Sequence, residues 1–258
     1  MTVEQVAEHL LCSPSKVSRM ETGHRGATLR DVRDLCDLYG VDEPAERERL
    51  MTLAREGKQQ GWWQSFALPH APFIGLEQAA ASMRIYHCAV VPGILQIGDY
   101  TRALHNVGIP EFPDPDVIEQ RVAERATRQE VLTRANPPSV EIILDEAVLH
   151  RPIGGKSVMG QQLDRIIAVS AYPNVTVKVL PFAVGAHPAL ESDFIMLDFS
   201  GKAPSVVYVE GLVGNIFLER ELDIERYEQV FKRLRAMASN PKDSVAMLTK
   251  IRATYTSD

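Results

Sequence analysis

The sequence predicts a protein of two domains, a small domain made mostly of helices followed by a larger α+β domain with a mainly antiparallel sheet. The chain of 258 residues is longer than one small helical module needs. Hydrophobic residues recur at helical spacing up to about residue 58, whereas after Pro138 the pattern is that of extended strands. Both tryptophans stand between these regions. We assign residues 1–58 to the first domain, 59–72 to an aromatic linker and 73–258 to the second domain.

The composition is that of a soluble globular protein, with 45% hydrophobic and 24% charged residues. The sequence contains no apolar run of ~18 residues and no signal peptide, so we expect a cytoplasmic protein without a membrane segment. The cysteines, at 12, 36 and 88, are too far apart for a zinc pair and are expected to be core residues. The histidines form no close ligand pairs, so we predict no metal and no cofactor.

Residues 13–23 predict a short helix, because the sequence contains a typical start signal and a typical end signal for one. Ser13 is a typical capping residue, and Pro14 suits the first helical position because its missing N–H would be unpaired there anyway. Gly23 can supply the left-handed residue that ends a helix. Val17 and Met20, three positions apart, are expected to face a core. The opposite face then carries polar groups, from Ser15, Lys16, Ser18 and Arg19.

Further helices flank this one. Apolar residues at helical spacing predict a helix from Val3 to about Leu11, with a tight turn after it. Thr28 is expected to cap a helix that ends before Gly40, and Pro44 begins a charged helix that runs to about Lys58. The ring cluster formed by Trp62, Trp63 and Phe66 is interpreted as a plug between the domains, with an exposed stacking platform as the alternative.

The first domain resembles a known family. The segment TVEQVAEHLLCSPSKVSRMETG followed by TLRDVRDLCDLYGV is similar to the Cro/C1-type (Xre-like) helix-turn-helix, which implies double-stranded DNA as a partner and residues 13–23 as the recognition helix. Basic residues at 16, 19, 25 and 30 oppose only Glu21 in a chain of net charge −6, and such a basic patch is typical of a nucleic-acid interface. The candidate DNA-binding residues are Ser13, Ser15, Lys16, Ser18, Arg19, Arg25, Thr28 and Arg30. The alternative is an ordinary helical bundle with a solvated basic face.

The resemblance also implies a helix before the first predicted one. Only Met1 and Thr2 precede that helix, so the first helix of the family is expected to be missing. Restoring an upstream segment is then expected to raise both the melting temperature and the DNA affinity, because it would cover apolar surface.

The second domain is predicted to begin with a strand around Ile85 to Val91, followed by a helix to about Asn106 and a proline-containing loop. A long helix from Asp114 or Asp116 to Arg134 is expected to expose charged residues as a salt-bridged, solvated face, with DNA contact as the alternative. These charged residues are Arg121, Glu124, Arg125, Arg128 and Glu130. Further strands are predicted at 140–144, 175–180, 194–199, 206–209 and 214–218, and further helices at 156–171, 224–238 and 241–253.

The second domain also resembles a family. Segments such as GLEQAAASMRIYHCAVVPGILQIGDYTRAL, LDEAVLHRPIGG and NVTVKVLPFAVGAHPALESDFIMLDF are similar to the uncharacterised C-terminal domain of WhiJ-like regulators of actinobacteria. This resemblance implies an antitoxin-like transcriptional regulator that works with a small partner protein.

Charged residues at predicted strand ends and in loops suggest a ligand pocket in the second domain. The candidates are Asp145, Glu146, Arg151, His187, Asp193 and Glu210. A catalytic acid–base site and plain loop charges are the alternatives, because sequence spacing cannot show hydrogen-bond reach. The run Gly154-Gly155-Lys156-Ser157 is similar to the end of a P-loop, but His150 stands where that pattern needs a glycine.

Together these observations predict a sequence-specific transcriptional regulator, expected to be a homodimer and not an enzyme, whose second domain binds a small-molecule effector or a partner protein. One alternative is a protein-interaction module that has lost DNA binding. The other is an enzyme that uses His187 and Glu210 of the second domain.

Overall fold

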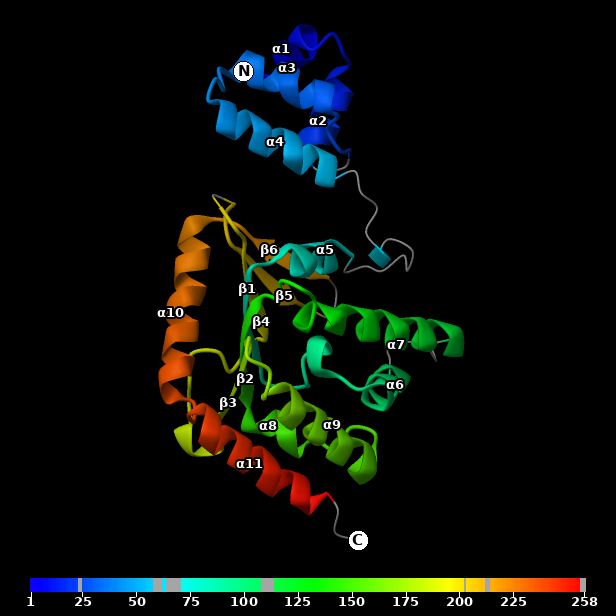
Figure 1. The fold of residues 1–258 in the computed structure, drawn as a ribbon, viewed down its shortest axis with the longest axis vertical. Coiled ribbons are helices and arrows are strands. Elements are labelled where there is room, and N and C mark those ends of the chain that lie inside the picture. Colours follow the sequence, from blue (N-terminus) through cyan, green and yellow to red (C-terminus); the bar gives the residue numbers. More distant parts are fainter. Residues whose placement is uncertain are drawn as a thin grey trace. The chain divides into compact units, whose positions relative to one another are not determined.

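The computed structural model describes residues 1–22, 25–57, 62–63, 71–107, 114–201, 203–211 and 214–255. The chain divides into two compact units, Met1–Gln64 and Ser65–Asp258, and each is considered by itself. Figure 1 gives the labels of the helices and strands.

The first unit is built from short helices around a small core. Its α-helices are α1 Val3–His9, α2 Pro14–Glu21, α3 Leu29–Tyr39 and α4 Pro44–Glu56. Val6, Ala7 and Val17 are its buried centre, and Met20 packs against them as predicted. The helix-turn-helix expected from the sequence is therefore present as α1 and α2.

Side-chain caps begin three of these helices, because each has Thr or Ser at the preceding position. Ser13 Oγ accepts the backbone N–H of Lys16 at 3.3 Å, and Thr2 forms a capping box with Gln5. Thr28 forms a second capping box with Asp31. The predicted helix end at Gly23 and the predicted end of α4 near Lys58 lie outside the described residues.

The turn between α1 and α2 differs from the prediction. Helix α1 ends at His9, and Leu11 was expected on its apolar face. Instead Leu11 is 91% exposed and has a φ of 50°, in the left-handed region that leucine rarely adopts. The tight turn needs this conformation at position 11, so the local backbone geometry overrides the apolar pattern.

The second unit contains a six-stranded mixed sheet of order β3-β2-β1-β4-β5-β6. The strands are β1 Ser82–His87, β2 Ser139–Asp145, β3 Val175–Leu180, β4 Phe194–Asp198, β5 Val206–Glu210 and β6 Asn215–Leu218. The predicted α+β class is confirmed, with helices on both sides of the sheet (Figure 1).

The sheet is mainly antiparallel, as predicted, but it includes two parallel pairs. The β1–β4, β4–β5 and β5–β6 pairs are antiparallel, whereas β1–β2 and β2–β3 are parallel. The parallel pairs arise because helices connect β1 to β2 and β2 to β3, which is the usual crossover between parallel strands. The first strand was predicted to reach Val91, but it ends at His87, and the following residues form a loop.

Helices cover the sheet on both faces (Figure 1). They are α5 Ala71–Ala79, α6 Gly98–Asn106, α7 Pro115–Gln129, α8 Glu146–His150, α9 Gly155–Val169, α10 Glu221–Met237 and α11 Pro241–Thr254, with short 3₁₀ turns at Gly93–Leu95, Glu130–Leu132 and Phe182–Val184. Helix α10 lies on one face, where Phe231 and Leu234 pack against Tyr86, Phe194 and Met196. Helices α5, α7 and α6 lie on the other face (Figure 1).

The prediction for α7 is wrong in one respect. Its charged residues were expected to form a solvated face, yet Glu124 and Arg128 are buried, and Arg121 and Arg125 are only partly exposed. By contrast the apolar side chain of Val117 is 44% exposed. The helix therefore turns part of its charged face inward, where Arg128 contacts Glu77 of α5.

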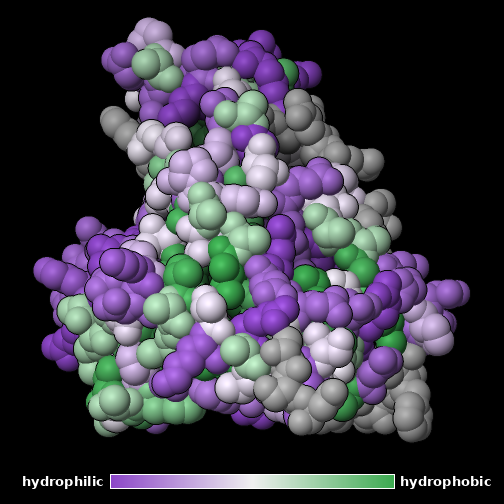
Figure 2. All heavy atoms as spheres, turned by 60° about the horizontal axis from the view of Figure 1, so that its bottom comes forward, coloured by the Kyte–Doolittle hydropathy of each residue, from purple (hydrophilic) through white to green (hydrophobic). Residues whose placement is uncertain are grey.

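Hydrophilic residues predominate on the face drawn in Figure 2, and hydrophobic residues form small groups among them. Within the part of the chain that the structure describes, no helix is both long and apolar enough to cross a membrane. Trp62 and Trp63 lie edge to face, with ring centroids 5.9 Å apart, while Phe66 is outside the described residues. The role of the ring cluster as a plug stays a prediction.

Candidate functional site

Helix α2 presents a polar face beside its buried one. Val17 is enclosed in the core, while Ser15, Ser18 and Arg19 are exposed on the other side of the helix, as expected from the spacing. Among the described residues Arg19 has no acidic partner within ion-pair distance. This face therefore offers hydroxyl groups and a free guanidinium to a ligand.

Lys16 is engaged inside the unit. Its ammonium group lies 2.5 Å from Asp31 Oδ1, and Asp31 also accepts hydrogen bonds from the backbone N–H and the hydroxyl of Thr28. Although burial acts to raise it, the hydrogen bonds from Lys16 and Thr28 hold the pKa of Asp31 at about 2. The pair joins α2 to the start of α3 and fixes their relative orientation.

The remaining candidates differ in how free they are. Arg25 is exposed, and its backbone N–H donates to the Arg19 carbonyl at 2.9 Å, so the two side chains start close together. Arg30 is largely exposed at the start of α3, with Nε 3.5 Å from Asp34 Oδ2. The hydroxyl groups of Ser13 and Thr28 are occupied by helix capping. Arg19 and Arg25 are thus the most available cations of the predicted set.

In the second unit the predicted pocket residues lie in separate places. Asp193 and Glu210 line one cavity, whereas His187 lines a second hollow. Glu146 accepts the backbone N–H of Phe182 and contacts His150, and Arg151 is exposed after α8.

His187 and Asp145 lie close together on the α10 side of the sheet. His187 Nε2 is 3.4 Å from Asp145 Oδ2 and 3.5 Å from the Tyr86 hydroxyl, and its Nδ1 accepts the backbone N–H of Ala189. The imidazole is 2% exposed and both of its nitrogens have neighbours. These surroundings are typical of a histidine with a structural role. His187 and Glu210 do not line the same cavity.

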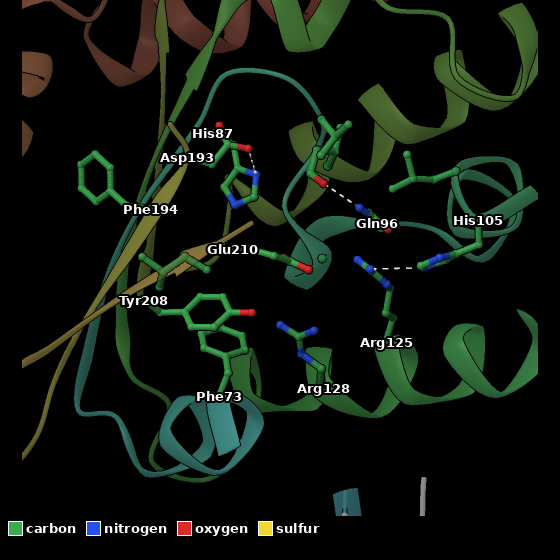
Figure 3. Close-up of a pocket in the computed structure, with 15 residues that line it drawn as sticks. Phe73, His87, Gln96, His105, Arg125, Arg128, Asp193, Phe194, Tyr208 and Glu210 are labelled. Atoms are coloured by element: carbon green, nitrogen blue, oxygen red, sulfur yellow. Dashed lines mark hydrogen bonds and ion pairs between the residues drawn. The ribbon is translucent and has the colours of Figure 1, made fainter. Parts of the chain in front are cut away.

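The cavity that contains Asp193 and Glu210 has a volume of about 290 Å³ and lies at the carboxyl end of β1 (Figure 3). Open α/β sheets commonly bind ligands outside the carboxyl ends of their parallel strands. Here β1 is parallel to β2 on one side and antiparallel to β4 on the other. The lining residues are Phe73, His87, Val90, Val91, Gly93, Gln96, Leu104, His105, Arg125, Arg128, Asp193, Phe194, Ile195, Tyr208 and Glu210.

Hydrogen bonds brace the loop that follows β1 and forms one wall of the cavity. Gln96 Nε2 donates to the Val91 carbonyl at 2.6 Å, and the Val91 N–H donates to the Tyr100 hydroxyl. From α9, the buried Gln162 accepts the N–H of Ile97 and donates to the Leu95 carbonyl, both at 2.8 Å. Because these side chains are buried, the wall is fixed by the fold.

Arg128 is neutralised by carboxylates. Its guanidinium makes two hydrogen bonds to Glu77 of α5, at 2.8 and 2.9 Å, and a third to Glu124. Although burial acts to lower it, these carboxylates raise the pKa of Arg128 above the usual value. The Arg128 guanidinium also lies over the Phe73 ring, 5.2 Å from the centroid.

Arg125 is in a different position. It extends from α7 into the cavity, where its Nη2 is 3.4 Å from His105 Nε2 (Figure 3). Its enclosed Nε has no hydrogen-bond partner, and within the described part of the chain it makes no ion pair. Burial, followed by repulsion from Arg128, lowers the pKa of Arg125 to about 10. A Cβ atom at Gly93 would lie 2.6 Å from its Nη1, so the guanidinium occupies space that a side chain at position 93 would partly fill.

The acidic side of the cavity is divided between two carboxylates. Asp193 accepts the Cys88 N–H at 2.6 Å, and its other oxygen is 3.2 Å from His87 Nδ1 without hydrogen-bond geometry. Although burial acts to raise it, His87 and Cys88 hold the pKa of Asp193 below the usual range. Glu210 extends from the end of β5 toward the cavity and makes no ion pair with any described residue (Figure 3).

Sequence reasoning missed the arginines of this cavity. Arg125 and Arg128 line it, and with Arg121 they are spaced so that they share one helical face, which was the available signal. Interleaved glutamates suggested a solvated face instead. Among the residues that the structure describes, no group of three histidine, cysteine or acidic side chains is arranged to hold a metal.

The protein thus has two domains. The N-terminal one is a helix-turn-helix unit, a class of domain that binds DNA, and the C-terminal one is an α+β unit with a cavity whose wall is fixed by hydrogen bonds. Comparison with family models gives the same division. Residues 71–250 match Domain of unknown function (DUF5753), and residues 1–50 match Helix-turn-helix domain. The chain therefore belongs to the DUF5753 family. No curated protein and no solved structure matched the chain.

Proposed function

We propose that the protein is a transcriptional regulator that binds specific DNA sequences through the exposed face of α2. The observation that carries the proposal is the pairing of a buried Val17 with an exposed, unpaired Arg19 on the same short helix. Arginine on such a helix can make two hydrogen bonds to guanine in the major groove. Arg25 and Arg30 supply positive charge for phosphates.

Finer features of the proposal come from the resemblance to Cro/C1-type domains and WhiJ-like regulators. They are a homodimer on two half-sites about one helical turn apart, a cytoplasmic location, and an antitoxin-like role with a small partner protein or effector at the second domain. We propose that the second domain binds and does not catalyse, since His187 has both ring nitrogens occupied and lies away from Glu210.

The test begins with selection of bound sequences from a random DNA pool by the full chain. Binding of the enriched sequence is then measured at two salt concentrations for the wild type, Arg19→Ala and Arg252→Ala. Arg252 is a matched control because it loses the same charge but pairs with Asp164 in the second unit.

We expect Arg19→Ala to lose about 1–3 kcal/mol of DNA-binding free energy and to relax specificity at one base pair. Arg252→Ala should bind DNA about as tightly as the wild type. If Arg19→Ala weakens binding equally to all DNA sequences, and the slope of log affinity against log salt concentration falls by about one, then Arg19 contacts a phosphate. If no sequence is enriched and binding is absent at low salt, the interaction-module alternative replaces this proposal.

A further inference from the structure

The cavity at the carboxyl end of β1 contains two opposite charges that make no ion pair with any described residue. Arg125 extends from α7 and Glu210 from the end of β5, and both line the same space (Figure 3). Arg128 of the lining is neutralised by Glu77, while Asp193 accepts the Cys88 N–H and lies 3.2 Å from His87 Nδ1. Among the described residues of the lining, Arg125 and Glu210 are therefore a guanidinium and a carboxylate without an oppositely charged group within ion-pair distance.

An enclosed arginine without an ion pair is costly for the fold, because desolvation of a charge is not repaid unless partners replace the water. The position of Arg125 beside a preformed cavity therefore favours a role in binding. Gly93 supports this reading, since the absence of a side chain there leaves room for the Arg125 guanidinium. The planar guanidinium suits a carboxylate, to which it can make two parallel hydrogen bonds.

Glu210 restricts the choice of ligand. A dianion such as phosphate would be repelled by Glu210 and by Asp193, which both line the cavity. A ligand that carries an ammonium group as well as a carboxylate would satisfy both free charges. The stacked rings of Phe73 and Tyr208, 4.1 Å between centroids, add an apolar wall for a side chain.

We propose that this cavity binds a small zwitterion of the amino-acid class, with its carboxylate on Arg125 and its ammonium group near Glu210. The volume of about 290 Å³ is at the lower end of the range for ligand pockets, which fits a molecule of this size. The proposal does not depend on DNA binding by the first unit, so either can fail alone.

The test uses the full chain and the common L-amino acids as probes in a thermal-shift screen, followed by calorimetry of the strongest one. For that amino acid, the corresponding acid without the amino group, the corresponding amine without the carboxylate, and inorganic phosphate are compared. We expect at least one amino acid to raise the melting temperature, and each one-charge analogue to bind about tenfold or more weakly.

Two variants locate the site. Arg125→Met is expected to abolish the response and to raise the melting temperature of the ligand-free protein by about 2–4 °C, because an unpaired charge is removed from an enclosed place. Glu210→Gln is expected to weaken amino-acid binding by about tenfold or more. Arg252→Met is the control, because that side chain pairs with Asp164 and does not line the cavity.

The proposal is overturned if no amino acid raises the melting temperature, or if the response survives in Arg125→Met. It is also overturned if phosphate or the carboxylic acid alone binds as tightly as the amino acid. A lower melting temperature for ligand-free Arg125→Met would give Arg125 a structural role and would likewise overturn it.

Discussion

Leu11 shows how a single backbone conformation can override a side-chain pattern. Its place in the apolar series of α1 predicted a buried residue, yet the turn to α2 places it in the left-handed region and in solvent. Short-range signals such as Ser13, Thr28 and Asp114 predicted helix starts correctly, because a cap depends only on residues a few positions away. A turn was predicted, but the left-handed conformation of Leu11 was not, because it depends on how α1 and α2 pack.

We expect Leu11→Gly to stabilise the first unit by up to about 1 kcal/mol. A left-handed leucine costs roughly 1–2 kcal/mol, and the greater freedom of glycine in the unfolded chain offsets part of the gain. Thermal unfolding measures the change. Leu11→Ala is the matched control, because alanine keeps the conformational cost and the leucine side chain makes little contact at 91% exposure. Equal melting temperatures for the two variants would show that φ at this position is not strained.

Helix α7 shows the same lesson for a whole element. Asp114 was one of its two predicted starts, and the helix ends at Gln129 instead of the predicted Arg134. The direction of its charged face was not predicted. The buried orientation depends on Glu77, which comes from α5 and is 51 residues away from Arg128 in sequence. The parallel pairing of β1 with β2 was missed for a related reason, because periodicity predicts a strand but not its neighbour.

We expect Glu77→Gln to destabilise the second unit by about 3–5 kcal/mol. The substitution removes the carboxylate that makes two hydrogen bonds to Arg128, and it leaves a buried guanidinium with Glu124 alone. Denaturant unfolding of the full chain gives the change. Glu119→Gln is the control on α7 itself, because its exposed pair with Arg102 is expected to be worth at most about 1 kcal/mol. Similar effects for the two variants would mean that the Arg128 pair is no stronger than a surface pair.

On the scale of the whole molecule, the division into two units was predicted from the change of periodicity, and each unit has a core of its own. The candidate site was predicted only in part. Asp193 and Glu210 follow from their places at strand ends, whereas Arg125 and His87 reach the same cavity from other elements. A cavity that collects residues from α5, α7, β1, β4 and β5 cannot be derived from local patterns.

We expect the two units to unfold in separate transitions that respond differently to acid. The pKa of Asp31 is about 2, below the usual 3.8. The ionised carboxylate therefore stabilises the folded first unit above about pH 4, and this stabilisation is lost as the pH falls toward 2. Calorimetry between pH 5 and about pH 3 should show the transition of the first unit moving to lower temperature. Asp31→Asn should lower the melting temperature of the first unit already at pH 5 and should make it less dependent on pH. The melting temperature of the second unit should not change. A single transition that moves as one in both proteins would contradict the prediction.

The strand order also has a consequence for synthesis on the ribosome. Strand β1 lies at the centre of the sheet, yet its antiparallel neighbour β4 emerges much later, and Ser82 bonds to Asp198 across 116 positions. At about 5–20 residues per second, the open edge of β1 waits roughly 6–23 s for this partner. During that interval the nascent chain exposes the unpaired edge of an apolar strand. The yield of folded protein in cells should therefore depend on chaperones that cover such edges.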